Sequence, residues 1–199
     1  MQSCESRAAG AAMRHCHALR GLLCVLLLAA SALGAASAGA DAPQELPPFT
    51  HSAASEWLNT VPLDADALRG RPVLIEVWTF ECSNCLASLG WMQRIATEYR
   101  PLGLVVVGVH SPELPQERDA AQVAAAVRRL GIRYPVMLDA DYSYWRALGN
   151  HYWPAFYLYD AQGRLRSTRV GELHSGDAGA QAFERLIAAQ LASPGAARP

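Results

Sequence analysis

A run of apolar and β-branched residues, Val73 to Trp78, leads almost directly into two cysteines, Cys82 and Cys85. One acid, Glu76, interrupts a run that is otherwise typical of a strand buried on both faces. Apolar residues then recur at helical spacing up to Tyr99, so we expect a helix that begins at the first cysteine. Cysteines three residues apart at a helix start share one face, close enough to form and break a disulfide.

The rest of the chain alternates between strand-like runs and stretches with helical spacing. We expect strands at 104–109, 135–138, 155–159 and 164–170, and helices at 117–130, 141–148 and 177–191. The segment 160–163 contains a glycine and predicts a hairpin between the last two strands. The predicted fold class is therefore α/β, with a central mixed sheet flanked by helices.

The first forty residues have the composition of an export signal. Arg14 and Arg20 precede an apolar run at 22–28, and small residues at 36–40 offer cleavage sites. The uncharged stretch is also about 20 residues long, which suffices for a membrane span. We expect residues 1–40 to be a signal peptide or an N-terminal membrane anchor. The folded part is then expected in the periplasm or otherwise outside the cytoplasm, where disulfides persist.

The remainder has the size of one domain. We expect a tether at 41–55, a compact domain at 56–192 and a flexible tail at 193–199. After residue 40 the chain has 14 arginines, no lysine and 17 acidic residues, without a basic arm, so a nucleic-acid partner is not expected. Because the other three cysteines lie in the leader, Cys82 and Cys85 are the thiols of the folded part.

Four segments in this order carry a resemblance to a known family: Phe80–Cys85, Gly108–Glu113, Tyr134–Val136 and Asn150–Ala155. From about residue 57 to 172 the chain resembles extracytoplasmic thioredoxin-like proteins of the TlpA/redoxin type, most closely the thioredoxin-like domain of DipZ proteins. The resemblance implies a thioredoxin fold with an inserted strand-helix element, made of the segments 117–130 and 135–138. It also implies a redox-active disulfide between the two cysteines and no cofactor.

The position of each cysteine suggests its role. The N-terminus of a helix stabilises a thiolate, so Cys82 is the expected attacking residue and Cys85 the residue that resolves the mixed disulfide. Burial is expected to raise the pKa of Glu76. By resemblance, Glu76 lies behind the site and takes the proton of Cys85. An ion pair between Glu76 and an arginine is the alternative.

Further site residues follow from the resemblance. Pro154 matches the cis-proline that faces the cysteines in thioredoxin-like proteins, and Trp153 then contacts an extended substrate. Phe80 is a substrate-contact candidate, as is Trp78, with core packing as the alternative for both. The resemblance implies a protein-disulfide reductase, acting in cytochrome c biogenesis or periplasmic thiol maintenance. Its partners are protein thiols or disulfides and a membrane electron-donor protein, with membrane contact only through an uncleaved leader.

The same residues are compatible with other functions. Thr79 and Cys82 have the spacing of a peroxiredoxin site, which permits a thiol peroxidase. The two thiolates could also hold copper or zinc in a metallochaperone, or form a zinc site completed by His110, His151 or His174. A permanent disulfide between the two cysteines is a further alternative. We nevertheless expect no resident metal.

Some positions are less informative or depart from the family. His110 and Glu113 border the cysteines or have ordinary loop roles, and His51 and His174 are expected on the surface. Many relatives have tryptophan where this chain has Glu81, and proline in the helix where it has Gly90. These two departures leave the reduction potential, and thus the direction of electron flow, open.

Overall fold

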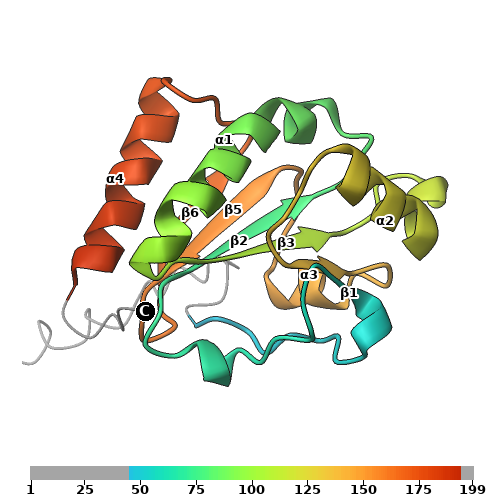
Figure 1. Cartoon of the computed structure of the whole chain (residues 1–199), viewed down its shortest axis with the longest axis horizontal. Helices are drawn as coiled ribbons and strands as arrows, with labels where there is room; N and C mark the ends of the chain where they lie inside the picture. The colour runs from blue at the N-terminus through green and yellow to red at the C-terminus, as the bar shows by residue number, and fades with distance from the viewer. Residues whose placement is uncertain (1–44, 194–199) are drawn as a thin grey trace, which may run out of the picture. The chain divides into compact units, whose positions relative to one another are not determined.

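The computed structural model describes residues 45–193, which form a six-stranded sheet and four α-helices (Figure 1). The strands are β1 (Trp57–Leu58), β2 (Val73–Trp78), β3 (Val105–His110), β4 (Val136–Leu138), β5 (Ala155–Tyr159) and β6 (Leu165–Val170). The helices are α1 (Ser83–Tyr99), α2 (Ala120–Arg129), α3 (Ser143–Ala147) and α4 (Ala178–Ala192), with short 3₁₀ turns η1 (Ala54–Glu56), η2 (Asp66–Leu68), η3 (Arg100–Leu102) and η4 (Pro115–Arg118). The predicted leader at 1–40 lies outside the described residues, as does nearly all of the predicted tail. None of the helices within 45–193 is long and apolar enough to cross a bilayer.

The sheet is mixed, in the strand order β1-β4-β3-β2-β5-β6. The central strands β2, β3 and β4 run parallel, whereas β5 pairs antiparallel with β2, and β6 and β1 pair antiparallel at the two edges. This arrangement confirms the predicted α/β class and thioredoxin fold. The inserted element is also present, as α2 followed by β4. Because β2 is central, the residues after its carboxyl end lie in the middle of one end of the sheet.

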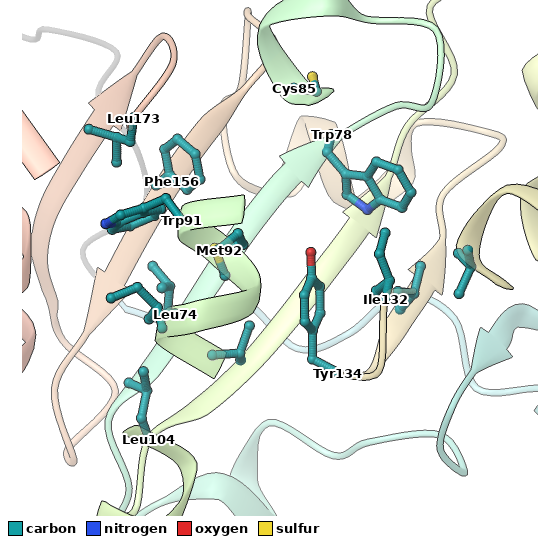
Figure 2. Packing of buried hydrophobic residues seen from close by; sticks show 14 of the residues in the cluster. Leu74, Trp78, Cys85, Trp91, Met92, Leu104, Ile132, Tyr134, Phe156 and Leu173 are labelled. Carbon is teal, nitrogen blue, oxygen red and sulfur yellow. The ribbon is translucent and has the colours of Figure 1, made fainter. Parts of the chain in front are cut away.

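Two apolar clusters cover the two faces of the sheet. The face of β2 that carries Leu74 and Trp78 packs against α1, α2 and α4, and Figure 2 shows part of this cluster. The other face, which carries Ile75 and Val77, packs against α3 and residues preceding β2. Both faces of β2 are therefore buried, as its nearly continuous apolar sequence predicts.

Three sequence predictions need correction. The helix expected at 117–130 begins at Ala120, because Asp119 caps it and residues 115–118 form the separate turn η4. Part of the expected tether packs on the domain: Leu46 N–H donates to Gly163 O at 2.7 Å. His51, expected on the surface, is 9% exposed and bonds to the buried Asp139, 88 residues away. That partner becomes visible only in the folded chain.

Two glycines should respond in opposite directions to the same substitution. Gly108 pairs with Glu76, and an added Cβ would lie 3.0 Å from Trp78 Nε1 and 3.1 Å from Tyr134 Cε2. We expect Gly108→Ala to lower the free energy of unfolding by about 1–3 kcal/mol through overpacking. Gly90 lies in α1 with nothing within 4 Å of an added Cβ, so Gly90→Ala should raise it by about 0.5–1 kcal/mol. Urea unfolding measures both, and equal effects would contradict the close packing at Gly108.

Candidate active site

The two cysteines differ in access to solvent. Cys82 is the N-cap residue of α1, and its Sγ accepts a hydrogen bond from Cys85 N–H at 3.2 Å. Cys82 is partly exposed, whereas Cys85 is 2% exposed. Burial raises the pKa of the Cys85 thiol well above its usual range, and Cys82 and Glu76 act in the same direction. An incoming molecule can therefore reach Cys82, while Cys85 needs a base in order to ionise.

Glu76 lies in β2, on the face that is covered by α1, and is 1% exposed. Its only side-chain partner within the described residues is the Tyr134 hydroxyl, which donates to Oε2 at 2.8 Å. Figure 2 shows this hydroxyl pointing toward the end of the sheet that carries Cys85. Burial raises the pKa of Glu76 to about 7, partly offset by the bond from Tyr134. The predicted rise in the pKa of Glu76 is thus confirmed. The alternative, an ion pair between Glu76 and an arginine, is wrong, because no arginine among residues 45–193 contacts this carboxylate.

The Trp153–Pro154 peptide bond is cis, as the resemblance implies. Pro154 immediately precedes β5, whose Ala155 pairs with Val77 near the carboxyl end of β2, so the proline lies at the same end of the sheet as the cysteines. Trp153 Nε1–H donates to the carbonyl oxygen of Ser111 at 2.9 Å, and its ring lies 4.3 Å from the ring of Trp145. These contacts hold the segment before the proline in place.

The aromatic residues before Cys82 pack mainly inside the protein. Phe80 stacks on the ring of His110 at a centroid distance of 5.5 Å, and Trp78 meets the same ring edge-on at 5.2 Å. Both aromatic side chains are buried. Burial lowers the pKa of His110 to about 4, so this imidazole is neutral at pH 7. His110 also lies 3.2 Å from the hydroxyl of Thr79, and this contact fixes its orientation.

Glu117 holds the loop before Cys82, a role that the sequence did not indicate. Its carboxylate is 1% exposed and accepts hydrogen bonds from the Thr79 hydroxyl and from Glu81 N–H at 2.9 Å. The other oxygen accepts from the N–H groups of Glu113 and Leu114 at 2.7 and 2.8 Å. Burial favours a higher pKa, but these hydrogen bonds outweigh it and lower the pKa of Glu117. An inward-facing acid in a turn leaves no periodic signal in the sequence.

Potential metal ligands gather away from the cysteines. Atoms of His51, Asp139 and Asp141 lie within 4.8 Å of one another. Asp139, however, already accepts from the backbone N–H groups at the start of α3 and from Ser111 Oγ at 2.8 Å. In the part of the chain that the structure describes, neither cysteine joins such a group of three ligands. The acid that acts on the cysteines electrostatically is instead the buried Glu76, whose charge raises the pKa of Cys85.

Comparisons with known proteins agree with this fold. The Redoxin family model matches residues 41–183. Protein DipZ of Mycobacterium bovis is 43% identical over 123 residues, which cover 58% of this chain and 17% of DipZ. Thiol-disulfide oxidoreductase YkuV of Bacillus subtilis is 28% identical over 128 residues, covering 64% of this chain and 84% of YkuV. A thiol-disulfide isomerase from Corynebacterium glutamicum aligns with a TM-score of 0.61 at 23% identity, covering 77% of this chain and 99% of the isomerase.

The similarity spans only 17% of the DipZ chain, so what DipZ does as a whole does not transfer with it. The resemblance predicted from the sequence is nevertheless confirmed at the level of family and fold. Because the family model covers more than half of the sequence, the chain belongs to the redoxin family, with a thioredoxin-like fold.

Proposed function

We propose that the chain is an extracytoplasmic thiol-disulfide oxidoreductase that acts on proteins through Cys82 and Cys85. The observation that carries the proposal is the difference in burial among three groups. Cys82, at the start of a helix, is partly exposed, whereas Cys85 and the acid Glu76 are buried. The relatives named as thiol-disulfide oxidoreductase and isomerase support the same chemistry. The leader-like composition of residues 1–40 supports export, with residues 56–192 as the catalytic domain.

The reaction follows from the positions of the sulfurs. The Cys82 thiolate attacks one sulfur of a substrate disulfide, forms a mixed disulfide and releases the other sulfur as a thiolate. Glu76 then takes the proton of Cys85, whose sulfur attacks Cys82 Sγ and releases the second substrate sulfur. The substrate gains two electrons, and Cys82 and Cys85 become a disulfide. A dithiol on a membrane electron-donor protein returns the two electrons and completes the cycle.

Substrate contacts come from the residues around Cys82. The backbone of Trp153 before the cis-proline offers hydrogen-bonding groups to an extended peptide, and the exposed ring of Tyr152 adds an apolar surface beside it. Phe80 contributes mainly by holding the loop against His110. In the reductive direction the substrates are disulfides in proteins that take part in cytochrome c maturation or in other periplasmic proteins.

Trapping tests the proposed roles of the two cysteines. We expect Cys85→Ser, expressed in its own cell envelope, to accumulate mixed disulfides, because Cys82 still attacks but nothing resolves the adduct. The adducts should disappear on reduction and should be absent from the Cys82→Ser/Cys85→Ser control. Non-reducing electrophoresis with mass spectrometry identifies them. A folded, exported Cys85→Ser protein without adducts would contradict the exchange mechanism.

The direction of electron flow needs a separate measurement. Equilibration of the Cys82/Cys85 pair with glutathione or dithiothreitol redox buffers yields its reduction potential. A value near that of thioredoxin, about −270 mV, supports the reductive role, whereas a value near about −120 mV assigns the chain to disulfide formation.

A further inference from the structure

A cavity of about 760 Å³ lies at the opposite end of the sheet from the cysteines. It opens beside Val105, the first residue of β3, whereas Cys82 follows the carboxyl end of the parallel strand β2. Its volume is within the range of about 300–1,000 Å³ that is usual for small-molecule sites. The walls come from the loop after β1, from α1 and from the segment before β4. Cys82, Cys85 and Glu76 do not line this cavity, although Tyr134, the hydrogen-bond partner of Glu76, does.

The charged side chains of the cavity are all arginines: Arg71, Arg100 and Arg133. No aspartate or glutamate lines it, although the whole chain has a formal net charge of −1. Among residues 45–193, none of the three guanidinium groups lies within ion-pair distance of a carboxylate, while Arg69, Arg94 and Arg164 do. Three uncompensated positive charges around one hollow raise the local concentration of anions.

The other walls determine which donors are available to a bound molecule. The side-chain amides of Asn59 and Gln93 donate to backbone carbonyl groups, Asn59 to Ile132 O and Tyr134 O at 3.0 Å and Gln93 to Leu130 O at 2.8 Å. The guanidinium groups are thus the main charged donors that face the cavity, and Arg71 is positioned by its Nε bond to Gly103 O at 3.2 Å. Much of the remaining lining is apolar and includes Leu63, Leu68, Leu104, Val105 and Val106.

We propose that this cavity binds a small organic anion that carries two or more negative charges and an apolar part. The planar guanidinium group pairs with carboxylate and phosphate oxygens through two hydrogen bonds, and the apolar walls cover the remainder of the molecule. The concave shape favours a small molecule over a flat surface such as a membrane. The proposal does not rest on the thiol chemistry, because the cavity and its arginines exist whether or not the chain is an oxidoreductase.

Tyr134 provides an internal reporter of binding. It lines the cavity, and its hydroxyl donates to Glu76 at 2.8 Å. A molecule bound against Tyr134 should therefore shift the nuclear magnetic resonances of Tyr134 and of Thr97, another lining residue, while those of the exposed Ser175 remain unchanged. These shifts locate the site without any measurement of activity.

The test uses citrate and inorganic pyrophosphate as probes in calorimetric titrations of the purified full chain. We expect one anion per chain, with affinity that falls as salt is added. The Arg100→Gln/Arg133→Gln variant should bind about tenfold more weakly or worse. The control Arg128→Gln/Arg129→Gln removes the same charge from exposed positions of α2 outside the cavity, and it should bind as the unmodified chain does.

Three outcomes would overturn the proposal. One is that neither soluble anion binds. Another is that both double variants weaken binding equally, which would mean that only net charge matters. The third is that phosphatidylglycerol vesicles sediment the chain while both soluble anions fail to bind, which would assign the arginines to a membrane surface instead. Urea unfolding checks the folding of each variant. Replacing exposed arginines that make no ion pair should change the free energy of unfolding little.

Discussion

Glu117→Gln is expected to lower the free energy of unfolding by about 2–4 kcal/mol, although the side chain keeps its size. One carboxylate oxygen accepts from Thr79 and Glu81, and the other accepts from Glu113 and Leu114. An amide replaces one of these oxygens with an NH₂ group, so in either orientation two donors lose their acceptor and face another donor. Each buried donor left without a partner costs about 1–3 kcal/mol.

Glu98→Gln is the matched control, because Glu98 lies on α1 and makes an exposed ion pair with Arg94. Such a pair contributes at most about 1 kcal/mol. Urea unfolding at pH 7 compares the two variants. Since Glu117 fixes the loop before Cys82, its loss should also increase hydrogen exchange at Glu81 N–H beyond the effect on global stability. Equal stability of the two variants would show that Glu117 is not what holds the loop.

The sequence predicted the parts of the fold that rest on local periodicity. The bounds of β2 follow from a continuous apolar run, which is the pattern of a strand buried on both faces. The bounds of α1 follow from apolar residues at helical spacing after Cys82, which is the pattern of a helix buried on one face. The early start predicted for α2 was wrong because Asp119 caps the helix and residues 115–118 form the turn η4. From this turn Glu117 bonds to the Thr79–Glu81 loop, and no local sequence pattern reports that tertiary contact.

The same distinction applies to the candidate site. Glu76 was identifiable as a buried acid because its neighbours in β2 are apolar, but its partner Tyr134 lies 58 residues away. The cavity with three arginines is still less visible, since Arg71, Arg100 and Arg133 come from three separate loops or turns. Residues that meet only through sheet topology leave no spacing signal in the sequence.

Glu76→Gln should remove a large pH dependence of stability. In the native state this carboxyl has a pKa of about 7, against an ordinary value of 4.5. Between those two pH values the unfolded chain releases the proton while the native chain keeps it, so stability falls as pH rises through this window and is constant above it. The loss amounts to about 3 kcal/mol. Urea unfolding of the dithiol form at pH 4.5 and pH 8 should show this loss in the unmodified chain and not in Glu76→Gln.

The same substitution tests the base proposed for Cys85. Without Glu76, resolution of a mixed disulfide at Cys82 should slow about a hundredfold at pH 7, while the first attack by Cys82 keeps its rate. In the unmodified chain the resolution rate should rise with pH through about 7, where Glu76 ionises.

Tyr134→Phe is the companion variant. It keeps the carboxylate but removes the hydrogen bond that lowers the pKa of Glu76, so the midpoint of the pH profile should move to higher pH. Stopped-flow measurement of both steps separates the roles. An unchanged midpoint in Tyr134→Phe, or an unchanged resolution rate in Glu76→Gln, would mean that another group deprotonates Cys85.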